Sequence, residues 1–408
     1  MTKYGRSPWV DRFSKARIPA YPRQRGALRA SVVIVGGGLT GCATAYACAA
    51  AGVNVVLVEA EQIGRGSTGS ASGWISGDPG VFFLEVEKAL GLKRARHAFQ
   101  SWRRAALDFA ALLRRLDIKC GLESTSSAIV AITPDQAARL KRDHKARRDA
   151  GIDVPFLGAR VLQNELALGA VAAIRDTAGG ELDPYRACLG LAAAAADRGA
   201  KLFERSPVRK ITFNRRNADV VMPAGSIRAD RVVIATGRPT ALCKALARHF
   251  WFQTGYLTLT ERVPAKIRQQ LGRRAAIVRD CAQPPHVVRW VDDERLLVAG
   301  ADTLSPPARL VDRIAVQRTG QLMYELSTLY PDISGVLPEY GWDAAYARTS
   351  DGLPFIGPHR NFPHQLFAFG DSSHSVTGSY LASRILLRCH LDDLDPADAS
   401  FAFTRYER

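Results

Sequence analysis

The sequence predicts a two-domain α/β protein in which a parallel-sheet domain is interrupted by a second domain of mixed β-sheet and helices. Its 408 residues are too many for one compact core. Segments 31–35 and 53–58 have the apolar, β-branched composition of buried strands, and a helical segment at 39–51 separates them. Strands of this type recur near 231–235 and 366–369, so the parallel-sheet domain is expected to be discontinuous.

The other elements follow from hydrophobic periodicity and from glycine and proline boundaries. Helices are predicted at 82–116, 134–150, 184–198, 308–329 and 376–389. Further strands are predicted at 126–133, 201–204, 208–213, 219–222, 256–260, 276–279, 286–290, 296–299 and 355–356. We therefore place a basic arm at 1–30, the parallel-sheet domain at 31–85, 155–245 and 345–408, and the second domain at 86–154 and 246–344.

Composition argues against several classes of protein. The hydrophobic fraction of 47% and the charged fraction of 23% are typical of a globular chain. No window approaches the roughly 18 apolar residues that a membrane span needs. The first residues lack the apolar core of a signal peptide, so we expect a cytoplasmic protein. The seven cysteines include no C-x-x-C pair, which argues against a disulfide framework and against a metal site.

The net charge of +17 is concentrated in two regions. Residues 1–30 carry eight basic side chains and one acidic side chain, and a second basic stretch covers residues 93–148. Such charge attracts RNA, anionic lipid or acidic substrates without specifying any of them. We expect a solvated basic surface rather than a nucleic-acid partner.

A glycine-rich turn links the first strand to the first helix. It reads G-G-G-L-T-G and fits the pattern G-x-G-x-x-G. Gly36 permits the tight turn, Gly38 lets the backbone approach a pyrophosphate, and Gly41 lets the helix pack on the strand. The helix N-terminus at Leu39 and Thr40 then offers N–H groups to the phosphates. This turn predicts a dinucleotide-binding, Rossmann-like domain.

Two features beyond the turn indicate which dinucleotide is bound. Glu59, which Ala60 follows, ends the second strand 23 residues after Gly36 and is placed to accept from ribose hydroxyls. A second small-residue segment covers 64–73, where a nicotinamide enzyme needs no such loop. In a flavoprotein it would surround the pyrophosphate and the ribityl chain, through Gly66, Ser67, Thr68, Gly73 and Trp74. The sequence therefore favours FAD.

Several segments together resemble the D-amino-acid-oxidase-like family of FAD-dependent oxidoreductases, which includes glycine, sarcosine and γ-glutamylputrescine oxidases. The resemblance is carried by VVIVGGGLTG, VVLVEA and GRGSTGSASG, by Asp183-Pro184-Tyr185 and Ser206-Pro207-Val208, and by segments 233–237, 349–357 and 370–377. These segments follow one another in the family's order through most of the chain.

The resemblance implies further cofactor contacts. Val208 matches a backbone contact to adenine, and Thr236 and Gly237 match a strand end beside the cofactor. The turn before the last helix matches a block that faces the flavin, and it contains Gly370, Ser373, His374, Ser375, Val376 and Thr377. Family members with covalent FAD carry a cysteine where this chain has Ala344, or a histidine in the loop that here covers 67–73. Because this chain has neither, the resemblance implies non-covalent FAD.

On the substrate side the chain departs from the family. Glycine oxidases have a carboxylate-binding arginine where this chain has Tyr346, and sarcosine oxidases have lysines where it has Thr377 and Val298. Arg348 would share the strand face of Tyr346 and is the predicted replacement cation. Arg289 matches a family arginine that either contacts substrate or pairs with a turn acid.

Other side chains complete the predicted substrate site. His374 either contacts the flavin or substrate or holds its own loop. Trp342 resembles a tryptophan of the γ-glutamylputrescine group. An aromatic pocket that favours an amine is expected from Trp74, Tyr256, Trp342 and Tyr346.

Together these features predict an FAD-dependent oxidoreductase that oxidises the C–N bond of a small amine or amino acid. Hydride would pass to flavin N5, and water would hydrolyse the imine. O₂ or an electron-acceptor protein would take the electrons. Two alternatives stay open: a flavin oxidase acting on a modified tRNA base, and a flavin subunit that passes electrons to a partner protein.

Overall fold

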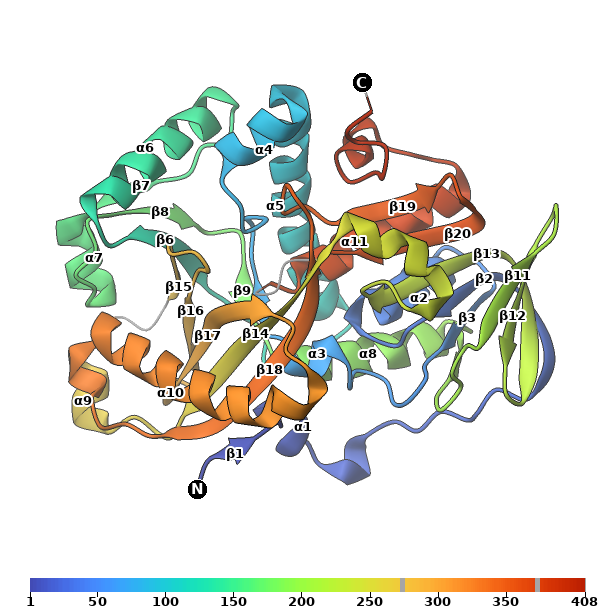
Figure 1. Cartoon of the computed structure of the whole chain (residues 1–408), viewed down its shortest axis with the longest axis horizontal. Helices are drawn as coiled ribbons and strands as arrows, with labels where there is room; N and C mark the ends of the chain where they lie inside the picture. Colours follow the sequence, from blue (N-terminus) through green and yellow to red (C-terminus); the bar gives the residue numbers. More distant parts are fainter. Residues whose placement is uncertain (272–275, 371–374, 408) are drawn as a thin grey trace.

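The computed structural model describes residues 1–271, 276–370 and 375–407 and has the predicted α/β class. Two large sheets lie side by side, with helices packed around both (Figure 1). Within the described ranges, no helix combines the length and the apolar composition needed to cross a membrane.

One sheet has eight strands and contains the predicted β-α-β unit. Its strand order is β10 (Lys201–Phe203), β3 (Val55–Val58), β2 (Gly26–Val35), β13 (Gly225–Gly237), β12 (Ala218–Met222) and β11 (Lys210–Phe213), and β20 (Phe362–Phe369) joins β13 to β19 (Phe355–His359). The central strands are parallel, and Val32, Val33 and Ile34 of β2 are fully buried. Continuous apolar runs of this kind are expected where helices cover both faces of a sheet.

Small residues bring three helices close together beside this sheet. α2 (Leu39–Ala50) packs against α8 (Pro184–Asp197) and α11 (Thr377–Leu391). Buried alanine and cysteine side chains such as Ala45 and Cys42 line α2. The N-terminus of α2 is thereby fixed at the carboxyl end of β2.

The other sheet has nine strands and is mixed. Its order is β1 (Lys3–Tyr4), β18 (Pro338–Arg348), β14 (Trp251–Thr260), β17 (Arg295–Leu304), β16 (Val287–Val291), β15 (Ala276–Asp280), β6 (Ser126–Ala131), β8 (Ala172–Asp176) and β7 (Phe156–Gly158). α10 (Val311–Leu329) packs on β14, β17 and β18, and α6 (Pro134–Asp149) packs on β6 and β8. The long strand β18 runs between the two halves of the molecule (Figure 1).

Short elements complete the described chain. A three-stranded sheet joins β4 (Trp74–Ile75), β9 (Gly180–Glu181) and β5 (Glu123–Ser124). The remaining helices are α1 (Pro8–Asp11), α3 (Ser67–Ser70), α4 (Phe83–Leu90), α5 (Leu92–Arg115), α7 (Ala159–Leu166) and α9 (Ala265–Gln270). Single 3-10 segments cover Lys15–Arg17, Ala241–His249, Ala308–Leu310, Pro331–Ile333 and Pro396–Ser400.

Several elements of the structure differ from the prediction. The helix predicted at 82–116 is two helices, because Gly91 between them adopts a φ of +83°. Residues 156–176, for which no strand was predicted, supply β7 and β8 to the nine-stranded sheet; the alanine-rich sequence of β8 lacks the usual β-branched signal. The basic arm is partly folded onto the protein, since β1 pairs with β18 and Ser7 and Trp9 are buried.

Candidate active site

The glycine turn between β2 and α2 has the geometry that its sequence predicts. Gly36 has a φ of +111°, and a Cβ there would lie 2.6 Å from the carbonyl oxygen of Ala235. A Cβ on Gly41 would lie 1.9 Å from the oxygen of Gly36, so only glycine allows the helix to approach the strand this closely. Beside Gly38 a Cβ would meet only the Thr68 hydroxyl, at 3.2 Å. The turn therefore leaves space at the N-terminus of α2.

A cavity of about 500 Å³ lies at this N-terminus. Eight predicted cofactor-binding residues line it: Leu39, Gly66, Ser67, Thr68, Thr236, Gly237, Ser375 and Val376. The Leu39 N–H donates to the Thr68 hydroxyl at 2.8 Å, which joins the glycine turn to α3. The two predicted small-residue segments thus form one site.

Residues that were not predicted as cofactor contacts also line this cavity. They include Gly5, Arg65, Arg238 and Ala344. Arg65 and Arg238 are exposed cations on the cavity wall. Two cations and a helix N-terminus attract an anion, so the residues fit the pyrophosphate of a dinucleotide.

Glu59 directly follows β3, beside the glycine turn. Its carboxylate accepts from the N–H of Gly37 at 2.6 Å and from the N–H of Glu61 at 2.9 Å. Ala60 follows it at the surface, and Val208 is half-buried before β11. Glu59 therefore lies at the edge of the turn, where the ribose was predicted.

Three successive carbonyl groups of the 67–73 loop accept hydrogen bonds from side chains outside the loop. The Trp342 indole N–H donates to Ser70 O at 3.0 Å, and the Trp9 indole N–H donates to Ala71 O at 2.9 Å. The Ser7 hydroxyl donates to Gly69 O. Trp342 therefore supports the cofactor loop, and the basic arm supplies the donors of two of these three hydrogen bonds.

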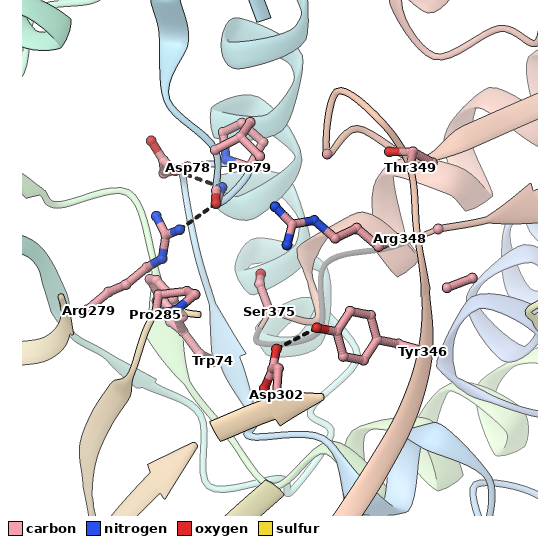
Figure 2. A pocket seen from close by; sticks show the side chains of 15 residues that line it. Trp74, Asp78, Pro79, Arg279, Pro285, Asp302, Tyr346, Arg348, Thr349 and Ser375 are labelled. Carbon is pink, nitrogen blue, oxygen red and sulfur yellow. Dashed lines mark hydrogen bonds between the residues drawn. The ribbon is translucent and has the colours of Figure 1, made fainter. Parts of the chain in front are cut away.

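A smaller cavity of about 90 Å³ adjoins the first. Tyr346 and Ser375 line both cavities. The smaller cavity is also lined by Trp74, Asp78, Arg279, Asp302, Arg348 and Gly370 (Figure 2). Because it meets the cofactor cavity at Tyr346, it is the candidate substrate site.

Tyr346 is hydrogen-bonded at the base of the substrate cavity. Its hydroxyl lies 2.8 Å from Gln253 Oε1, on the neighbouring strand, and also hydrogen-bonds the Asp302 carboxylate (Figure 2). The pairing of β14 and β17 is irregular at this point, and Ala301 adopts a φ of +52°. A Cβ on Gly255 would lie 2.9 Å from Asp302 Oδ1. A bulge and a glycine therefore direct Asp302 toward the cavity.

Two arginines face the cavity from different strands. Arg348 ends β18, and its guanidinium points into the cavity in Figure 2. It has neither a hydrogen bond nor an ion pair within the described part of the chain. Arg279 of β15 reaches the cavity from the other side and donates to the carbonyl oxygen of Gly80 at 2.5 Å.

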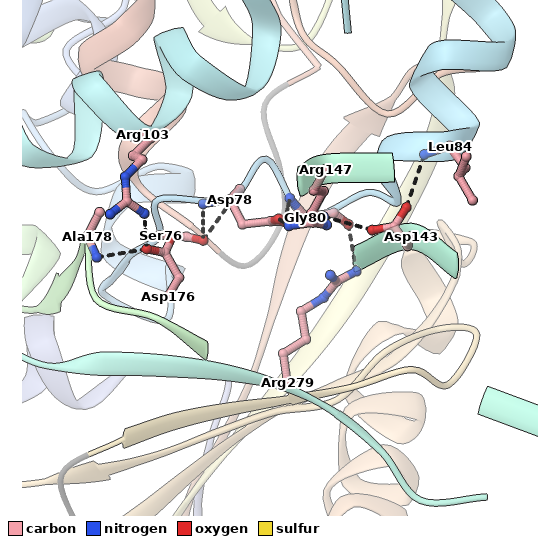
Figure 3. A network of polar contacts seen from close by, with 10 residues as sticks. All are labelled: Ser76, Asp78, Gly80, Leu84, Arg103, Asp143, Arg147, Asp176, Ala178 and Arg279. Atoms are coloured by element: carbon pink, nitrogen blue, oxygen red, sulfur yellow. Dashed lines mark hydrogen bonds and ion pairs between the residues drawn. The ribbon is translucent and has the colours of Figure 1, made fainter. Parts of the chain in front are cut away.

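A buried ionic network lies behind Arg279 (Figure 3). Arg147 pairs with Asp78 at 2.5 Å and with Asp143 at 2.7 Å. Burial opposes the charge of Arg147, but the two carboxylates outweigh burial and raise its pKa. Burial raises the pKa of Asp143. Asp78 also accepts from the Gly80 N–H at 2.7 Å, so the network fixes the segment that forms one cavity wall.

Besides Trp342, three predicted site residues lie away from the substrate and cofactor cavities. Arg289 lines a different cavity, pairs with Glu181 at 3.3 Å and donates to Ser72 O at 2.8 Å. Tyr256 is 2% exposed in the core of the nine-stranded sheet. The buried Thr377 hydroxyl donates to the carbonyl oxygen of Ser76 at 2.8 Å. The structure does not bring these side chains together with Tyr346 and Arg348.

Two further predicted contacts, Ser373 and His374, lie outside the described residues. Their neighbours Gly370 and Ser375 line the substrate cavity. Sequence reasoning missed Asp302 and Arg279, which carry no local motif and reach the cavity only through strand pairing.

A model of the FAD dependent oxidoreductase family matches residues 31–388. The chain belongs to this family. γ-Glutamylputrescine oxidoreductase of Escherichia coli K12 is 26% identical over 373 residues, which cover 90% of this chain and 85% of that protein. Glycine oxidase of Geobacillus kaustophilus is 26% identical over 361 residues, which cover 87% of this chain and 90% of that protein.

Solved structures show the same fold. The crystal structure of the Geobacillus glycine oxidase has a TM-score of 0.74 at 23% identity and covers 93% of this chain and 99% of its own. L-Amino acid deaminase from Proteus myxofaciens, in complex with anthranilate, has a TM-score of 0.76 at 17% identity and covers 100% of both chains. The predicted family, fold class, enzymatic nature and FAD cofactor are confirmed.

Proposed function

We propose that this FAD-dependent oxidoreductase oxidises the C–N bond of a small amine or amino acid, giving an imine that water hydrolyses. The main support is the cation Arg348, which has no hydrogen bond or ion pair among the described residues and lies in a cavity that shares Tyr346 and Ser375 with the cofactor cavity. Glycine and γ-glutamylputrescine, for which two relatives are named, both contain an amine. Bound FAD supplies the oxidising power by accepting a hydride from the substrate.

Different side chains of the substrate cavity bind different groups of the substrate. Arg348 holds the substrate carboxylate, which would otherwise be desolvated without a partner at a cost of several kcal/mol. Asp302 and Tyr346 hydrogen-bond each other at the side of the cavity that borders the cofactor. The Asp302 carboxylate attracts a protonated amine, which must pass its proton to Asp302 or to water before the neutral amine can lose hydride. Trp74, which is 3% exposed, closes a wall and excludes water.

The test is anaerobic flavin bleaching with a panel of amines and amino acids, followed by kinetics of Arg348→Met. For an amino-acid substrate we expect KM to rise at least about tenfold, equivalent to ~1.4 kcal/mol, while FAD stays bound. A simple amine of similar size is the matched control and should be nearly unaffected. If the natural substrate is a simple amine, Tyr346→Ala should reduce its oxidation instead. Loss of flavin from Arg348→Met would contradict both versions, because Arg348 would then hold the cofactor or the fold.

The electron acceptor is a separate part of the proposal. We propose O₂ or an electron-acceptor protein. Val298, which occupies the position of an oxygen-activating lysine in sarcosine oxidases, is 1% exposed in the core of the nine-stranded sheet. Flavin that bleaches anaerobically with substrate in an enzyme that consumes little O₂ would favour a protein acceptor. Rapid O₂ consumption would identify an oxidase.

A further inference from the structure

Arg279, which lines the substrate cavity, and Arg147, which lies behind it, have opposite electrostatic surroundings (Figure 3). Arg147 is 4% exposed and pairs with two carboxylates. Arg279 has no carboxylate within ion-pair distance anywhere in the described ranges, and its one hydrogen bond goes to the carbonyl oxygen of Gly80. Burial lowers the pKa of Arg279 more than the surrounding carboxylates raise it, whereas the pKa of Arg147 is raised. The fold therefore leaves Arg279 short of negative charge.

The Asp78 carboxylate, which contributes most of the negative charge at Arg279, already pairs with other groups. One oxygen of Asp78 pairs with Arg147 at 2.5 Å, and the other accepts from the Gly80 N–H at 2.7 Å. A guanidinium has several N–H donors, so Arg279 keeps donors beyond the one that Gly80 uses. Because Arg279 lines the cavity, an anion that enters it can pair with this cation.

Arg348 is a second cation that has no carboxylate partner among the described residues, and it lies on the opposite side of the same cavity (Figure 2). Asp302 provides a negative charge at the base, beside Tyr346. The cavity thus has two anion-binding positions and one position for a cationic nitrogen. A monocarboxylic amine would satisfy only one of the two arginines.

We propose that Arg279 binds a second acidic group of the substrate, so that the preferred substrate is a small amine carrying two carboxylates. This inference rests on the proposed function, in which Arg348 holds the carboxylate near the reacting carbon. Amino diacids and N-carboxyalkyl amino acids are the two chemical forms that the arrangement fits. Arg279 is then a specificity-determining residue, in contact with substrate at the end away from Asp302.

The first experiment measures binding without turnover. Holoenzyme is titrated with carbon-matched acids, succinate against butyrate and malonate against propionate, and the flavin absorbance change gives Kd. We expect the dicarboxylates to bind at least about tenfold more tightly. Arg279→Gln should abolish that preference and change the Kd of the monocarboxylates less than about twofold. Arg175→Gln is the matched control, because Arg175 pairs with Glu165 outside this cavity and the variant removes the same net charge.

The second experiment measures turnover with matched amines. Anaerobic flavin reduction is compared for glycine and N-carboxymethylglycine, and for alanine and aspartate in both enantiomers. We expect the diacids to be preferred by the wild type and by Arg279→Lys, which keeps the charge, but not by Arg279→Gln.

The results separate the two proposals. Equal binding of mono- and dicarboxylates by the wild type overturns the role of Arg279, and this readout holds even if Arg279→Gln does not fold. If Arg279→Gln weakens the binding of monocarboxylates and dicarboxylates equally, the proposed role of Arg279 is also overturned, because Arg279 and Arg348 would then bind the same carboxylate. If dicarboxylates bind tightly but no amine reduces the flavin, the anion-binding role of Arg279 is supported and the proposed function is refuted.

Discussion

The indole N–H of Trp9 offers a sharp test of the cofactor loop. It donates to the carbonyl oxygen of Ala71 at 2.9 Å, and Trp9 is 8% exposed. Trp9→Phe removes this donor and keeps an aromatic ring in the same space. A fully buried acceptor left without its donor costs about 1–3 kcal/mol, and for the partly buried Ala71 O this range is an upper bound. If the loop must keep this conformation to hold FAD, most of that cost falls on cofactor binding.

We therefore expect Trp9→Phe to raise the Kd of FAD about 5- to 30-fold, the factor that corresponds to one or two kcal/mol. The assay is quenching of FAD fluorescence on titration with apoprotein, together with the melting temperature of the apoprotein. Trp102→Phe is the matched control, because the buried Trp102 indole N–H has no hydrogen-bond partner among the described residues. Unchanged FAD affinity in Trp9→Phe, or an equal change in Trp102→Phe, would refute the reasoning.

Three further predictions concern the cofactor and the fold. Glu59→Ala should weaken FAD binding by about 1.5–3 kcal/mol in the same titration, because ribose loses a charged acceptor; unchanged affinity would remove Glu59 from the site. Acid precipitation should release FAD into the supernatant, since Ala344 lines the cavity where some relatives carry a linking cysteine; yellow precipitate would contradict non-covalent binding. Burial disfavours charged His286, but Asp280 at 2.7 Å and Glu325 at 2.9 Å outweigh it and raise its pKa above 6.5. Its contribution to stability should therefore be complete below pH 6.5 and disappear as the pH rises through the raised pKa. Urea unfolding at several pH values should show this fall, and His286→Gln should flatten it.

The cofactor half of the site could be predicted from the sequence because its signals are local. Gly36, Gly41 and Glu59 lie within one β-α-β unit. The steric reasons for Gly36 and Gly41 are those that the structure shows, whereas the Glu59 carboxylate accepts from the Gly37 N–H and its contact with ribose stays a prediction. In the sequence, the basic arm at residues 1–30 is distinguished only by its positive charge. Its contacts through Ser7 and Trp9 depend on how it crosses the molecule, which no spacing in the sequence encodes. The domain boundaries and the cytoplasmic location stay predictions.

The substrate half could not be predicted in the same way, because pairing between distant strands builds it. Arg279 and Arg289 look alike in the sequence, and only Arg289 has a match in the family pattern. In the structure Arg279 faces the substrate cavity, whereas Arg289 lines another cavity and donates to Ser72 O of the cofactor loop. The choice between the two arginines is made by the position of β15 and β16 in the sheet.

Asp302 shows most clearly why local rules fail at this site. Regular pairing of β17 with β14 breaks at this point, Ala301 takes a left-handed conformation that a residue with a side chain rarely adopts, and Gly255 leaves room for the carboxylate. A strand selected only for stability has no need of these three features. They coincide where a carboxylate is turned toward a cavity beside the cofactor site, as expected where function rather than packing determines the backbone. The irregular pairing of β14 and β17 made the position of Asp302 unpredictable from the sequence. The same irregularity supports the proposal that Asp302 binds the substrate.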